Sequence, residues 1–166
     1  MTLSASLLQN KRYVIVSLFL AVVASLLYHF LVENRAYVEL NVQTDKRTIF
    51  KIYWKQAGGE WSEERMAANV VKPGHTAYSF RIGDLNRISA LRIDPSERIA
   101  TVLIRSLVIT QRGFPPIRID TKEAFEQLRP LAGIRELTLD DQGLSIVPAN
   151  KDPWLGYDLP TLTRQS

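Results

Sequence analysis

Hydrophobic and polar positions divide the chain into two parts with different periods. Residues 13–32 read YVIVSLFLAVVASLLYHFLV, an apolar run with no formally charged side chain apart from the titratable His29. A helix of about 20 residues spans roughly 30 Å, the thickness of a bilayer's hydrocarbon core. The run also lacks the polar stripe that a helix on a globular core shows. The pattern therefore predicts a transmembrane helix over residues 13–32.

A cleaved signal peptide is the alternative for this segment. Lys11 and Arg12 would form its basic n-region, and Val22 and Ala24 would supply a small-residue cleavage site. However, the apolar run continues to Val32, and secretory h-regions usually stop sooner. This continuation favours an uncleaved anchor, with the lipid bilayer as an expected partner.

Charge near the two ends of the run predicts its orientation. Lys11 and Arg12 precede it with no acidic residue, whereas charges of both signs follow it. The positive-inside rule then places residues 1–12 in the cytoplasm and residues 33–166 on the far side. The chain has no cysteine, which fits an envelope protein without disulfides. We expect a bacterial inner (plasma) membrane protein whose C-terminal domain is periplasmic or extracellular.

From Ala36 onward the period changes to two, which is typical of half-buried strands. AYVELNVQ (36–43) places Val38, Leu40 and Val42 on one face, and TIFKIYW (48–54) alternates in the same way. These two segments are predicted to form a hairpin. Further strands are expected at 67–71, 76–82, 88–93 and 101–111.

The remaining segments complete a mainly β prediction. A short helix is expected at 121–128, with Asp120 or Thr121 as N-cap, followed by a hairpin at 134–148. Closely spaced strands joined by short loops favour an antiparallel β-sandwich or jelly roll of about eight strands. The predicted domains are a cytoplasmic tail (1–12), a transmembrane helix (13–32), an exported β-sandwich (33–148) and an irregular C-terminal tail (149–166).

The stretch LRIDPSERIATVLIRSLVIT (91–110) is interpreted mainly as architecture. Alternation places Arg92 and Asp94 on one face of a strand, where Arg92 is expected to pair with Asp94 or a cross-strand carboxylate in an ordinary surface or edge contact. The broken alternation between Ile104 and Leu107 predicts a β-bulge near Arg105 and Ser106.

Composition and motifs exclude several classes of function. The segment after residue 32 holds 19 basic and 17 acidic residues, and this balance is too weak for a nucleic-acid partner. Phosphate-binding, nucleophile-elbow and zinc-protease motifs are absent, so we expect no enzyme and no cofactor. His29 and His75 cannot share a metal site, and the acidic loops lack the dense spacing of a calcium site. No metal is predicted.

Aromatic residues provide the binding hypothesis. Flat rings can stack on the apolar faces of sugars, and the candidates for this role are Trp61, Tyr53, Tyr78 and Trp154. Trp61 follows two glycines in a loop, and Trp154 lies in the C-terminal tail. The competing interpretation is burial in the core, which is expected for Trp54 because it shares a face with Phe50 and Ile52.

The same region resembles an exported β-sandwich found in bacterial surface-polysaccharide membrane proteins, including some multi-span glycosyltransferases. The resemblance is carried by Trp61-Ser62-Glu63-Glu64, Tyr78-Ser79-Phe80, Leu91-Arg92-Ile93-Asp94-Pro95 and the strand Val102 to Ile109. NKDPWLGYDLP (150–160) matches a further piece, in which Asp-Pro leads into a last strand. The resemblance implies a jelly roll similar to carbohydrate-binding modules, without catalysis. This chain departs from the larger proteins because it has one predicted span and no multi-span enzyme body.

Two functional hypotheses follow. In the first, the exported sandwich binds cell-surface glycan or docks on a multi-span, glycan-handling membrane protein. In the second, the chain is a structural or assembly subunit of a membrane complex and acts mainly through its helix. Small residues that would allow close helix packing occur there at three- and four-residue spacings: Ser17, Ala21, Ala24 and Ser25.

Overall fold

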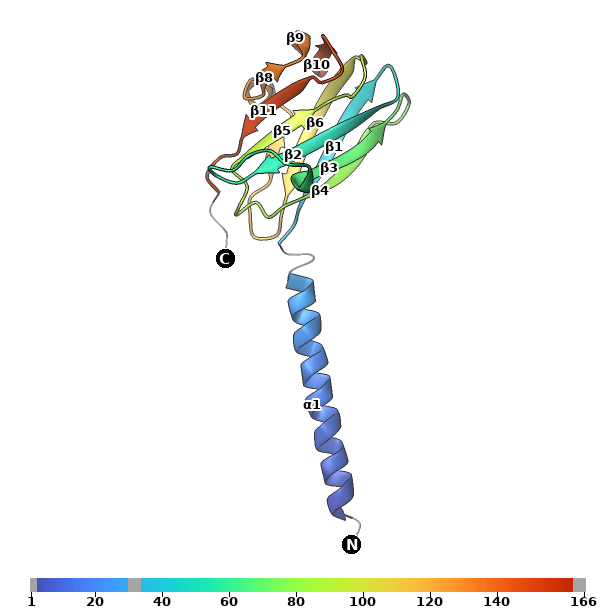
Figure 1. Ribbon diagram of the computed structural model, residues 1–166, viewed down its shortest axis with the longest axis vertical. Helices are drawn as coiled ribbons and strands as arrows, with labels where there is room; N and C mark the ends of the chain where they lie inside the picture. The colour runs from blue at the N-terminus through green and yellow to red at the C-terminus, as the bar shows by residue number, and fades with distance from the viewer. Residues whose placement is uncertain (1–2, 30–33, 163–166) are drawn as a thin grey trace. The chain divides into compact units, whose positions relative to one another are not determined.

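The computed structural model describes residues 3–29 and 34–162 (Figure 1). The chain divides into two compact units, residues 1–34 and residues 35–166, and each is described by itself. The first unit holds one long helix, and the second holds the β-structure.

Helix α1 runs over Leu3–Tyr28. Its sequence has no glycine or proline and is rich in leucine and alanine, which are strong helix formers. Large apolar side chains such as Val14, Leu18 and Phe19 are about two-thirds exposed. Within the described residues, no helix meets the length and hydropathy required to cross a membrane. The transmembrane assignment of residues 13–32 therefore stays a prediction.

The second unit is mainly β, with two antiparallel sheets that Figure 1 shows as layers. Sheet A has the order β4-β1-β6-β10-β9, and β7 also pairs with β6. Its strands are β4 (Ala77–Ile82), β1 (Ala36–Thr44), β6 (Val102–Thr110), β10 (Gly143–Pro148), β9 (Ile134–Asp140) and β7 (Ile117–Ile119). Sheet B has the order β3-β2-β5-β11-β8. Its strands are β3 (Met66–Val71), β2 (Thr48–Lys55), β5 (Ala90–Asp94), β11 (Trp154–Asp158) and β8 (Arg129–Ala132).

The core lies between the two sheets, as the period-two pattern predicted. Val38 and Leu40 of sheet A are fully buried, as are Phe50 and Ile52 of sheet B. The rings of Phe50 and Phe80 lie 5.8 Å apart and join β2 to β4 across the core. Alternate residues of each strand therefore point outward, and these form the surfaces considered below.

The predicted hairpin between the first two strands is wrong. β1 pairs with β4 and β6, whereas β2 pairs with β3 and β5 in the other sheet. The loop at residues 45–47 crosses from one sheet to the other. Alternation indicates which face of a strand is buried, but both partners of a hairpin and both layers of a sandwich satisfy the same pattern.

The prediction of an irregular tail over 149–166 also needs correction. Residues 154–158 form β11, which lies inside sheet B between β5 and β8. Leu155 and Tyr157 of this strand are buried, so the sandwich continues past the predicted boundary at residue 148. β7, β8 and β11 are only three to five residues long, too short for their alternation to stand out.

The predicted bulge in β6 is confirmed. Asn41 pairs with Ser106 but Val42 pairs with Ile104, which leaves Arg105 as the extra residue. Gly143, at the start of β10, has φ +130° and approaches the Ile104 carbonyl so closely that a Cβ atom would overlap it. The bulge and the β9–β10 turn therefore require glycine at this position.

Helix α2 (Lys122–Phe125) is shorter than the predicted 121–128. Thr121 is its N-cap, and its hydroxyl accepts a hydrogen bond from the Ala124 amide at 3.3 Å. Phe125 and Leu128 are buried against the core, so this segment covers part of the sandwich. A second short helical element, η2 (Glu63–Arg65), follows Trp61 in the β2–β3 loop.

Candidate functional site

The outer face of sheet B is the surface that gathers most of the candidate residues. We use this name for the side chains that alternate away from the core: Ile49, Lys51, Tyr53 and Lys55 of β2, Val70 of β3, Arg92 and Asp94 of β5, and Trp154 of β11. Strand register places Tyr53 opposite Arg92 and Lys51 opposite Asp94. Charged and aromatic groups therefore meet in the middle of the sheet.

Arg92 is the centre of this face. Its Nε and one terminal nitrogen donate to the two carboxylate oxygens of Asp94 at 2.9 and 2.6 Å. Its guanidinium carbon lies 4.2 Å from the centre of the Tyr53 ring and 4.8 Å from that of the Trp154 ring. The Arg92 side chain is 19% exposed and that of Asp94 only 6%. The four residues form a packed unit in which a bidentate ion pair is combined with cation–π contacts.

Burial and pairing act in opposite directions on Asp94. Removal from water raises the pKa of this carboxyl, and the adjacent guanidinium lowers it, with burial the larger effect. The hydrogen bond to Asp94 raises the pKa of Arg92, so the guanidinium stays charged. The two hydrogen bonds hold the ion pair together, but removing both charges from water costs free energy, as is usual for buried pairs.

Tyr53 belongs to this unit and is not an open stacking surface. It is 3% exposed, its ring lies under Arg92, and its hydroxyl donates to Glu63 of η2 at 2.9 Å. Burial, together with that hydrogen bond, raises the pKa of the Tyr53 hydroxyl. Tyr53 therefore orients Arg92 and ties the β2–β3 loop to sheet B.

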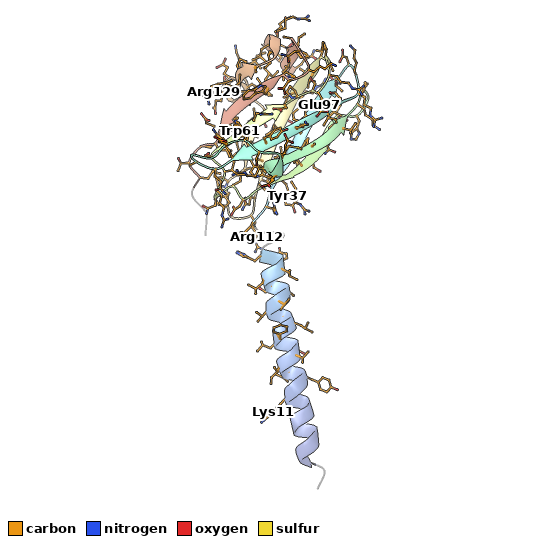
Figure 2. The ribbon with its side chains drawn as sticks, viewed as in Figure 1. Lys11, Tyr37, Trp61, Glu97, Arg112 and Arg129 are labelled. Atoms are coloured by element: carbon orange, nitrogen blue, oxygen red, sulfur yellow. The ribbon has the colours of Figure 1, made fainter. Side chains whose placement is uncertain are left out.

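Trp154 and Trp61 are both half-buried on the same side of the sandwich. Arg92 contacts the ring of Trp154, and the Lys55 ammonium lies 4.9 Å from the centre of the Trp61 ring. Figure 2 shows Trp61 and Glu97 toward opposite ends of β2. Both indoles are fixed by a cation from sheet B and stay partly accessible, as a stacking surface requires.

Tyr78 does not join the other candidates. It points to the inner side of β4 and packs against the core. Its hydroxyl accepts from the Lys72 amide at 3.0 Å and donates to the His75 carbonyl at 3.2 Å. The rings of Tyr78 and His75 meet edge to face at 4.7 Å. Tyr78 thus stabilises the β3–β4 turn.

The helix-packing candidates all lie in α1. Ser17, Ala21, Ala24 and Ser25 are exposed and keep their three- and four-residue spacings within regular helix. Such a stripe allows the close approach of another helix. The geometry of α1 is thus compatible with that role.

The importance of Arg92 and Asp94 was not predicted from the sequence, which indicated an ordinary surface or edge contact. The signal was present as two opposite charges two residues apart on a strand that ends in proline. What could not be seen was that Tyr53 and Trp154, distant in sequence, enclose the pair. Lys55 was also missed, because its contact with Trp61 depends on how the loop folds back.

A second surface lies on the outer side of sheet A. A cleft of about 400 Å³ is lined by eight residues of β1, β4 and β6: Glu39, Leu40, Asn41, Ala77, Tyr78, Ser79, Ser106 and Val108. The lining includes Tyr78, one of the predicted stacking residues, but neither Trp61 nor Trp154. Among residues 3–29 and 34–162, no group of three or more histidine, aspartate or glutamate side chains is placed to hold a metal ion.

Comparisons with known proteins identify no family. No family model matches the chain, and no curated protein matches it. One solved structure with a match is titled "Crystal structure of Delta413-417:GS LOX". It is 11% identical over 69% of this chain and 16% of that chain, with a TM-score of 0.28. A similarity at this level carries no argument about fold family or function.

Proposed function

We propose that this protein is a non-catalytic, membrane-anchored envelope protein whose β-sandwich binds glycan on the outer face of sheet B. The observation that carries the proposal is the pair of half-buried indoles, Trp61 and Trp154, each held by a cation of the same sheet face. A fixed, partly exposed aromatic ring suits the apolar face of a sugar because little side-chain entropy is lost on binding. A jelly-roll arrangement similar to carbohydrate-binding modules is part of this proposal.

Polar groups between the indoles would supply specificity. Arg92 and Lys51 offer donors to hydroxyl groups, and each is held in place by an ion pair, Arg92 with Asp94 and Lys51 with Glu97. Recognition sites commonly combine apolar surface with a few fixed polar groups. The sheet A cleft includes Tyr78, whose hydroxyl is bonded within the β3–β4 turn, but no indole, which is why sheet B is favoured.

Membrane anchoring is the second part of the proposal. It is supported by the twenty-residue apolar run and by the apolar side chains around α1, among them Leu18, Phe19 and Leu20. Basic residues before the run orient the sandwich away from the cytoplasm. The protein would then present sheet B to glycan outside the inner membrane, or to a multi-span protein that handles glycan.

Glycan binding can be tested with the full chain in detergent micelles on an array of bacterial surface polysaccharides. We expect retention by at least one polysaccharide, and a loss of affinity of about tenfold in Trp154→Ala and Trp61→Ala. Tyr37→Ala is the matched control, because Tyr37 makes a similar contact with Arg81 at 5.5 Å on sheet A. Absence of binding, or an equal loss in the control, would contradict the proposal.

A second candidate function is assembly through α1. It is favoured by the exposed stripe of Ser17, Ala21, Ala24 and Ser25. Replacing Ala21 and Ala24 with leucine would put larger side chains on this face and prevent the close approach of another helix. Loss of a co-purifying membrane protein in mild detergent, with glycan binding intact, would support the assembly role.

A further inference from the structure

A cleft at one end of the outer face of sheet B combines two arginines with an apolar floor. It has a volume of about 330 Å³ and is lined by Arg47, Thr48, Ile49, Val70, Glu97 and Arg98. Ile49 and Val70 face each other across β2 and β3, and Val70 is 43% exposed. The arginines come from two loops, residues 45–47 and residues 95–101. This volume is at the small end of ligand pockets, which are roughly 300–1,000 Å³.

The charges of the cleft are not compensated internally. Arg47 and Arg98 are exposed, and neither makes an ion pair within the part of the chain that the structure describes. Glu97, the one carboxylate on the lining, is paired with Lys51. The Glu97 amide also donates to the buried Thr48 hydroxyl at 3.0 Å, which holds this loop to β2. The cleft therefore presents two guanidinium groups beside aliphatic surface.

We infer that this cleft binds a uronic-acid residue of an acidic glycan. A guanidinium binds a carboxylate in bidentate fashion, and Ile49 with Val70 provides aliphatic surface for the C–H face of the sugar ring. A simple phosphate or sulfate has no apolar face to use this floor. The combination thus favours a carboxylated sugar over an inorganic anion.

The position of the cleft extends the proposed glycan surface. Along β2 the outer face runs from Ile49 through Lys51 and Tyr53 to Lys55 beside Trp61. At about 3.3 Å per residue this is a track of roughly 20 Å, long enough for several sugar units. The inference rests on the proposed function and names its ligand class: an acidic polysaccharide with a carboxylate at the Arg47–Arg98 end.

The test is isothermal titration of the full chain in detergent micelles with a short oligogalacturonate. Methyl-esterified oligogalacturonate, which has the same backbone without charge, and inorganic phosphate are the matched probes. We expect binding of the acid alone, weakened by salt and reduced about tenfold in Arg98→Gln and further in Arg47→Gln/Arg98→Gln. Arg135→Gln removes an exposed guanidinium from β9 and should leave affinity unchanged.

Three results would overturn the inference: no binding of oligogalacturonate, equal binding of phosphate, or equal loss in Arg135→Gln. The polysaccharide array separates this failure from failure of the proposed function. If neutral glycan binds through Trp61 and Trp154 while oligogalacturonate does not, the acidic cleft is wrong and the glycan surface stands. If oligogalacturonate binds through the arginines and neither indole matters, the indole surface is wrong.

Discussion

At the scale of single residues, Arg92 is the central charged residue on the outer face of sheet B. A charged side chain on an outer sheet face would normally extend into water, but Tyr53 and Trp154 enclose this one and Asp94 neutralises it. Exposed ion pairs contribute little to stability, whereas breaking a buried pair leaves an uncompensated charge. This protein has an ion pair of each kind, so the difference in their contribution to stability can be measured within one molecule.

Asp94→Asn should lower the free energy of unfolding by about 3 kcal/mol, because it keeps the shape of the side chain and leaves the Arg92 guanidinium unpaired. Asp158→Asn is the control, since Asp158 pairs with Arg129 at 2.5 Å but both side chains are more than half exposed. Its cost should stay below about 1 kcal/mol. Urea unfolding followed by tryptophan fluorescence gives both values, and equal effects would contradict the packed Arg92 unit.

Tyr157 should make the fold sensitive to alkali. Burial raises the pKa of its hydroxyl above the ordinary value of 10.0. Since the folded state holds this proton more tightly than the unfolded chain, the stability from it is complete below pH 10 and is lost as the pH rises through the raised pKa. Tyr157→Phe should match the parent near neutral pH and lose less stability in urea titrations above pH 10. An identical alkaline loss in the variant would show that another group is responsible.

At the scale of elements, the sequence predicts what is local and misses what depends on pairing. Alternation located β1, β2, β4 and β6 to within one or two residues, and the interrupted alternation around Arg105 located the bulge. The partners of β1 and β2 could not be predicted, because the same alternation fits either layer of a sandwich. Alternation did not predict β11, because its five residues after Asp152-Pro153 are too few to show a period, although the resemblance implied a strand there.

Only part of the candidate site could be predicted, because the position of a side chain also depends on residues that are distant in sequence. Trp61 and Trp154 were selected by residue type. Strand register places Trp154 on the outer face of sheet B, whereas the fold of the β2–β3 loop brings Trp61 to Lys55. Tyr53 and Tyr78 were selected on the same grounds, yet Arg92 covers the first and the β3–β4 turn uses the second. Burial of an aromatic ring depends on distant neighbours, which no local pattern contains.

The bulge at Arg105 yields a prediction about Gly143. Gly143→Ala should lower the free energy of unfolding by more than about 2 kcal/mol, because φ is +130° and the new methyl group would overlap the Ile104 carbonyl. Gly74→Ala is the control: its φ is +80°, but nothing lies within 4 Å of the added atom. It should cost only about 1 kcal/mol of backbone strain. Similar costs in both variants would mean that contact with the bulge is unimportant.

At the scale of the whole molecule, the chain combines one long N-terminal helix with a mainly β unit. The proposal assigns anchoring to residues 13–32 and recognition to the outer face of sheet B. The full chain should stay with membranes after washing in alkaline carbonate, and replacing Leu18 and Val22 with arginine should release it. Each central arginine costs about 3 kcal/mol on insertion. Release of the parent chain by the carbonate wash would contradict anchoring.

Glycan binding on the outer face of sheet B is the proposed function of this protein. Hydrogen–deuterium exchange of the full chain in detergent micelles, with and without a polysaccharide that it retains, identifies the strands that the glycan covers. We expect slower exchange in peptides covering β2, β5, β11 and the loop that carries Trp61, with exchange in β1 and β4 unchanged. Protection confined to β1, β4 and β6 would instead place the glycan in the sheet A cleft, and sheet B would not be the binding surface.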